Sequence, residues 1–112
     1  MKNDEDSRGT KTIFGNAIEK AVSDLFGEHV VPAFNQHLSC FYNITICDVF
    51  DNPTVLSEAL YKNFQSVTPT IERAIAKRFY NYMGIQFTPV PGCTLAGYVE
   101  IAKRLIAGNQ HN

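Results

Sequence analysis

The amino-acid sequence predicts an all-α fold: a compact bundle of about five helices with a disordered N-terminal tail. Apolar residues recur at three- and four-residue steps in five separate segments, which is the periodicity of one helical face. Glycine, asparagine or proline stands at most boundaries of these segments, where helices begin and end. The β-branched residues 44–46 have no second strand-like segment to pair with. At 112 residues we expect one domain, over residues 12–108.

The first segment divides into a tail and a helix. Residues 1–11 carry six charged side chains and one apolar residue, Met1, so they bury too little surface to offset the entropy of ordering. We therefore expect a flexible tail there and a helix over residues 12–26, which Gly27 ends. The inner face of this helix is predicted to hold Phe14, Ala17, Ile18, Ala21, Val22 and Leu25.

A second helix is predicted over residues 29–42. Its apolar face would consist of Val30, Phe34, Leu38 and Phe41. Pro32 is compatible with this helix because proline is tolerated in the first turn. Residues 48–50 are expected to form a short turn that brings Phe50 into the core.

The central element is a pair of helices, residues 53–64 and 68–83, joined by a tight turn. Asp51 or Asn52 would cap the first helix, which begins at proline, and Thr68 would cap the second. Gly84 would end the second helix. The two apolar faces would comprise Val55, Leu56, Ala59, Leu60 and Phe64, and Ile71, Ala74, Ile75, Phe79 and Tyr82.

The last part of the chain is predicted to be an irregular link followed by one helix. Residues 85–93 contain two prolines and a glycine, which disfavour regular structure. Thr94 would cap the final helix, Gly108 would end it, and residues 109–112 would be flexible. The buried face of this helix would hold Leu95, Tyr98, Val99, Ala102, Leu105 and Ile106.

Composition excludes several classes of function. The net charge of −1 argues against binding nucleic acid mainly through electrostatics. No segment is apolar enough to span a membrane, and the N-terminus lacks the apolar part of a secretory signal. Three cysteines cannot all pair within the chain, which favours a reducing, cytoplasmic location.

Catalytic and metal-binding signatures are weak. No glycine-rich phosphate loop and no nucleophile or zinc motif is present, so we expect no enzyme activity and no cofactor. His37, Cys40 and Cys47 are candidate zinc ligands, but their spacing lacks the close pairs of a structural site. We expect packing residues there and keep a small metal- or ligand-binding protein as an alternative.

Arg78 interrupts the apolar face of the helix over residues 68–83. Its stem could pack while its guanidinium reaches solvent, or it could pair with a carboxylate such as Asp48, Glu19 or Glu58. It could also face a partner or an anionic ligand. All three interpretations remain open from the sequence.

A basic strip is possible if the last two helices are neighbours. It would consist of Arg73, Lys77, Lys103 and Arg104. Because residues 53–83 also have the outline of a helix-turn-helix unit, a DNA-associated transcriptional regulator is an alternative function.

Three stretches resemble the Nitrosopumilus output domains, small helical signalling modules of ammonia-oxidising archaea. They are AIEKAVSDLFGE, FNQHLSCFYNITICDVFDNPTVLSEALYKNF and IERAIAKRFYNYMGI, within residues 17–85. Members carry a glycine in the turn between the central helices, where this chain has residues 65–68, QSVT. The resemblance implies a non-catalytic module that passes on a signal through protein contacts.

The leading prediction is therefore a non-enzymatic interaction module that binds a protein partner and is able to form a homodimer. It requires an exposed apolar or aromatic patch, for which Tyr61 with Phe64 and Tyr80 with Tyr98 are candidates. The residues predicted to contact the partner are Arg73, Lys77, Arg78, Tyr61 and Tyr80.

Overall fold

The computed structural model describes the backbone of residues 2–110 and the side chains of residues 9–107. Within that part of the chain it contains α-helices and short 3-10 helices and no β-strand, which confirms the predicted all-α bundle. The elements are α1 (Lys2–Phe26), α2 (Val30–Tyr42), η1 (Asp48–Phe50), α3 (Pro53–Phe64), η2 (Gln65–Val67), α4 (Thr68–Met83) and α5 (Leu95–Gln110).

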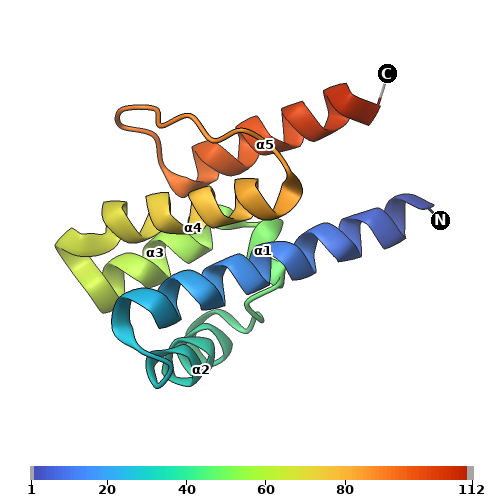
Figure 1. Ribbon diagram of the computed structural model, residues 1–112. Helices are drawn as coiled ribbons and strands as arrows, with labels where there is room; N and C mark the ends of the chain where they lie inside the picture. The colour runs from blue at the N-terminus through green and yellow to red at the C-terminus, as the bar shows by residue number, and fades with distance from the viewer. Residues whose placement is uncertain (1, 111–112) are drawn as a thin grey trace.

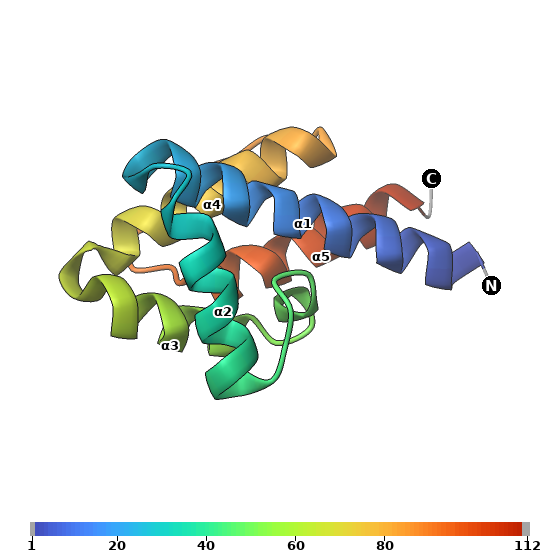
Figure 2. The same cartoon turned by 90° about the horizontal axis from the view of Figure 1, so that it is seen from below.

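Helix α4 lies at the centre of the bundle. In Figure 1 it runs between α1 and α5, with α3 behind it, and α1 and α4 point in opposite directions. Helix α2 crosses α1 at a steep angle on the far side from α5 (Figure 2). Because neighbours cover it on several sides, α4 buries seven residues, including Ile71, Ile75 and Phe79.

Three aromatic rings form the middle of the core. Phe14 of α1 meets Phe79 of α4 edge-on, with ring centroids 5.0 Å apart. Phe50 packs against both, at 5.4 Å from Phe14 and 5.7 Å from Phe79. The prediction that residues 48–50 bring Phe50 into the core is confirmed, since η1 buries its ring.

The link between α4 and α5 reverses the chain. Gly84 ends α4, as predicted; it adopts a left-handed φ of 72°, and its N–H bonds to carbonyls of the last turn. The irregular segment 85–93 then returns along the bundle, so that α4 and α5 run in the same direction (Figure 1). Thr94 caps α5 as predicted, with its Oγ1 accepting a hydrogen bond from the N–H of Gly97 at 3.2 Å.

The first and last helices are longer than predicted. Helix α1 begins at Lys2, well before the predicted start at residue 12; Met1 lies outside the described residues. Lys11 pairs with Asp51 at 2.7 Å and holds α1 where it leaves the bundle, and a helix once formed is easily extended. Helix α5 continues through Gly108 to Gln110, and residues 111–112 are not described.

Thr68 is not the cap of α4. It is the first residue of the helix, Val67 precedes it as the cap position, and the Thr68 hydroxyl has no hydrogen-bond partner. The tight 3-10 helix η2 continues directly into α4 and leaves no extended residue for a side-chain cap.

Four side chains predicted to face the core are exposed, and one of them is Leu105 of α5, at 42%. Phe41 is 70% exposed because it lies in the last turn of α2, whose core contacts are made by Phe34 and Leu38. Leu25 and Tyr82 are each 44% exposed, near the ends of α1 and α4. Periodicity identifies a helical face but not how far along that face a neighbouring helix extends.

Candidate binding groove

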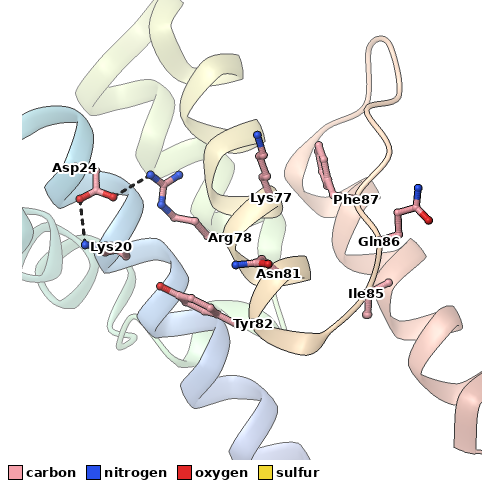
Figure 3. Close-up of a pocket in the computed structure, with 9 residues that line it drawn as sticks. All are labelled: Lys20, Asp24, Lys77, Arg78, Asn81, Tyr82, Ile85, Gln86 and Phe87. Carbon is pink, nitrogen blue, oxygen red and sulfur yellow. Dashed lines mark hydrogen bonds and ion pairs between the residues drawn. The ribbon is translucent and has the colours of Figure 1, made fainter.

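An open groove of about 700 Å³ lies across α1, α4 and the start of the link to α5. We call it the α1–α4 groove. Nine residues line it: Lys20, Asp24, Lys77, Arg78, Asn81, Tyr82, Ile85, Gln86 and Phe87. Figure 3 shows Arg78 and Tyr82 extending toward α1, while Lys77 lies on the side of residues 85–87.

Helical spacing positions most of these side chains. Lys20 and Asp24 are one turn apart on α1, as Arg78 and Tyr82 are on α4, so each pair shares a helical face. The left-handed turn at Gly84 redirects the chain, which lets residues 85–87 form the remaining side of the groove. Two rigid helices and one anchored segment therefore define its shape.

A buried aromatic cluster anchors that segment. Phe87 contacts the rings of Tyr80 and Tyr98, at centroid distances of 5.3 and 5.1 Å. The Tyr80 hydroxyl donates to the Tyr98 carbonyl oxygen at 2.6 Å, and the Tyr98 hydroxyl accepts from the N–H of Val90 at 3.0 Å. Burial raises the pKa of Tyr80 to about 12, with smaller contributions from Cys93 and Tyr98, so the hydroxyl remains a donor at neutral pH.

Arg78 pairs with a carboxylate across the helix interface. Its Nη2 lies 2.9 Å from Oδ2 of Asp24, and its Nη1 donates to the carbonyl oxygen of Ala74 at 3.3 Å. Lys20 contacts the other oxygen of Asp24 at 3.4 Å. The hydrogen bond from Arg78, followed by the interaction with Lys20, holds the pKa of Asp24 below its usual value.

Of the three interpretations of Arg78 that the sequence left open, the structure shows the ion pair with a carboxylate, but none of the three carboxylates named for it is the partner. Asp48 is occupied locally, where it accepts hydrogen bonds from the Thr45 N–H and hydroxyl at 3.1 and 3.0 Å. Glu19 accepts a hydrogen bond from Asn35 at 3.4 Å. Asp24 is separated from Arg78 by 54 residues, and no local spacing connects the two.

The groove carries excess positive charge. Lys20, Lys77 and Arg78 give three cations against the single carboxylate of Asp24, a net formal charge of +2 in a chain whose total is −1. Among the described residues, Lys77 forms no ion pair. A local reversal of sign of this kind favours an anionic ligand.

Apolar and aromatic side chains lie beside these cations. Tyr82 is well exposed, while Ile85 and Phe87 are half-buried and support the other side of the groove. A cation and an aromatic ring thus lie together on each side of α4. Interaction sites that use both charge and apolar contact have this combination.

The other predicted partner-binding residues lie outside the groove. Arg73 is exposed one turn before Lys77 on α4, outside the groove, and Tyr61 is 62% exposed on α3. Tyr80 is wrongly predicted: it is 2% exposed, as is Tyr98, so neither forms a surface patch. Both tyrosine rings belong to the buried cluster that anchors residues 85–93.

The lysines of the predicted basic strip have different surroundings. Lys103 lies over the Phe50 ring at 4.9 Å and pairs with Glu100 at 4.0 Å. Lys77, in contrast, lines the α1–α4 groove beside Phe87. The two lysines therefore interact with different neighbours. Arg73 and Lys77, both on α4, are exposed to solvent.

An exposed apolar surface covers one end of the bundle. Phe26 at the end of α1 stacks on Phe64 at the end of α3, with ring centroids 4.5 Å apart. Leu25 and Val67, both 44% exposed, belong to the same end of the molecule, where α1 ends and α3 turns into α4 (Figures 1 and 2). We call these four residues the end face; among them, only Phe64 is a predicted surface residue.

The three candidate metal ligands have separate environments. Cys40 is exposed, and His37 packs against Phe41 with ring centroids 4.7 Å apart. Cys47 packs against α1, where a side chain at Gly15 would approach its Sγ to 2.9 Å, and burial raises the pKa of the Cys47 thiol. Nowhere in the described part of the chain do three or more His, Cys, Asp or Glu side chains gather around a possible ion.

Comparisons of the chain with protein-family models, curated proteins and solved structures give no match. Within the residues that the structure describes, no helix has both the length and the apolar character needed to cross a membrane.

Of the groove residues, Lys77 and Arg78 were predicted from the sequence, whereas Asp24, Tyr82 and Phe87 were not. The only available signal was the Lys20–Asp24 spacing on one helical face. No spacing pattern in the sequence connects Lys20 and Asp24 with residues 77–87.

Proposed function

We propose that this protein is a non-catalytic interaction module that binds a partner protein through the α1–α4 groove. The observation that carries the proposal is the coexistence of unbalanced positive charge and accessible aromatic side chains on rigid helices. Charge selects and orients a partner, and apolar contact at the same place contributes affinity. The resemblance to signalling output modules agrees with this kind of role.

The chemistry of the groove supports binding over catalysis. No serine, cysteine or histidine lines it. Asp24, its one carboxylate, has a lowered pKa and is committed to Arg78, which makes it a poor general base. A binding role uses these same charges without requiring proton transfer.

Protein binding is favoured over the DNA-associated alternative by the position of α4. A recognition helix must project so that it enters a major groove about 12 Å wide. Helix α4 is instead flanked by α1 and α5, and its exposed stripe offers few cations besides Arg73 and Lys77 (Figure 1). The helix-turn-helix outline of α3 and α4 is best explained by core packing.

Site-specific photo-cross-linking in the native cell tests the proposal. A photoreactive amino acid at Gln86, an exposed groove residue, is expected to capture a discrete partner that mass spectrometry identifies. The same group at Glu100, exposed on α5 outside the groove, is the matched control. The capture should be lost in Lys77→Glu; equal capture from both positions, or none from Gln86, would overturn the proposal.

A further inference from the structure

The charged and apolar side chains of the groove indicate which kind of protein segment it binds. This inference rests on the proposed function. We infer that the α1–α4 groove binds a protein segment in which acidic side chains flank a bulky apolar one. In the free protein, Asp24 takes the position of one of the partner's carboxylates on Arg78. Asp24 is therefore an internal competitor that the partner displaces.

The pairing geometry of Arg78 leaves room for exchange. One terminal nitrogen contacts Asp24 at 2.9 Å and the other donates to the Ala74 carbonyl oxygen at 3.3 Å. A guanidinium has five N–H donors, so an incoming carboxylate can be accommodated in a two-bonded arrangement that the single contact with Asp24 lacks. The side chains of Arg78 and Asp24 are 30% and 37% exposed, and pairs this accessible contribute little to stability.

Lys77 provides a second position for an anion. It is exposed and, within the described residues, free of ion pairs, so a carboxylate can approach without displacing a protein group. It lies on the side of residues 85–87, while Arg78 lies on the side of α1 (Figure 3). Two anionic groups are thus bound on either side of the α4 surface.

The surface beside these cations suits an apolar side chain. Tyr82 lies next to Arg78 by one helical turn, and Phe87 with Ile85 lies on the side of Lys77. Phe87 is held by Tyr80 and Tyr98, so the apolar part of the groove is preformed and binding loses little conformational freedom.

A peptide carboxylate fits better than a phosphate group. Phosphate sites commonly use the free N–H groups at a helix N-terminus or in a glycine-rich loop. The groove instead follows the middle and the C-terminal end of α4, and all of its cations are side chains. We therefore expect nucleotides to bind the groove less well than an acidic peptide.

Fluorescence anisotropy with a labelled synthetic peptide tests the inference on the full chain. The peptide carries Asp and Glu on both sides of a single Phe, and a matched peptide has Asn and Gln in their place. The acidic peptide should bind with an affinity that falls as NaCl is added, and the neutral peptide should not bind. ATP and inorganic pyrophosphate are added as competitors and should not displace the peptide at equal concentration.

Two pairs of variants separate groove chemistry from overall charge. Asp24→Asn removes the competitor and should tighten peptide binding about five- to tenfold, whereas Glu100→Gln makes the same charge change outside the groove and should leave affinity unchanged. Lys77→Ala should weaken binding about fivefold or more, and Arg104→Ala on α5 should not. Lys77 makes none of the ion pairs within the described residues, so its variant is expected to fold normally.

The inference is overturned if Asp24→Asn fails to tighten binding, or if Glu100→Gln changes affinity equally. Binding of the neutral peptide, or displacement by ATP or pyrophosphate, also overturns it. If no peptide binds while Gln86 still captures a partner, the acidic-segment inference fails and the proposed function stands. If neither is observed, both fail.

Discussion

Ser57 of α3 donates a hydrogen bond to the carboxylate of Glu72 on α4, a polar link between the two central helices. Glu72 is 7% exposed, so its carboxylate depends on this donor more than a surface group would. The contact joins residues 15 positions apart and fixes how the α3–α4 hairpin closes.

Removing the donor should therefore destabilise the bundle. Ser57→Ala leaves a buried carboxylate without that partner, and we expect the free energy of unfolding to fall by about 1–3 kcal/mol. Urea denaturation followed by circular dichroism measures the loss. Ser66→Ala, at an exposed serine in η2, is the control and should change stability by less than about 0.5 kcal/mol. Equal effects of the two substitutions would show that the link contributes nothing.

Gln65 adopts a conformation that favours glycine. Its φ is 49° and its ψ is −119°, at the turn where the resembled output modules carry a glycine. Gln65→Gly should relieve this strain and stabilise the protein by about 1 kcal/mol, measured as a rise in the melting temperature. Gln36→Gly, at an exposed helical position of α2, should instead lower stability by about 1 kcal/mol. A loss of stability in Gln65→Gly would contradict the assigned strain.

Phe50 and Phe41 provide a test of burial. Phe50 packs against Phe14 and Phe79, and truncation to alanine should cost about 3–5 kcal/mol. Phe41 is 70% exposed although its spacing predicted an inner position, so Phe41→Ala should cost less than about 1 kcal/mol. Chemical denaturation compares the two, and a large cost at Phe41 would mean that α2 packs differently.

The Asp24–Arg78 pair predicts a pH dependence. The hydrogen bond from Arg78 lowers the pKa of Asp24 below its usual value of 3.8. As the pH falls below 3.8, the unfolded chain therefore takes up this proton before the folded one. The stabilisation from this pair is complete above that pH and is lost as the pH falls through the lower pKa of the folded protein.

Carboxyl carbon NMR measures this directly. In Arg78→Ala the pKa of Asp24 should rise toward 3.8, because the principal cause of the shift is gone. Arg104→Ala leaves the pair intact and should not change that pKa. If the pKa of Asp24 is the same in Arg78→Ala as in the unchanged protein, the ion pair does not persist in solution.

The fold followed from signals that act over short distances. Pro53 starts α3, Gly84 ends α4, and Thr94 caps α5, each as expected from the local sequence. The extension of α1 to Lys2 was missed because the polar residues 2–11 have no apolar face to reveal a helix.

The candidate groove was only partly predictable. Lys77 and Arg78 were predictable as cations on one helix, but the groove also needs Asp24 from α1 and Phe87 from the link after Gly84. Tyr80 was expected at the surface and is buried, because Phe87 and Tyr98 close over it.

The sequence by itself determined the helical class, the central hairpin and most helix ends, since these depend on dihedral preferences and hydrogen bonds within about two turns. Only the tertiary structure decided that Arg78 meets Asp24, that Phe41 and Tyr82 are exposed, and that a cationic, aromatic groove exists. These features depend on which distant side chains the packing of the helices brings together. The local sequence around a residue does not determine which distant side chains that residue contacts.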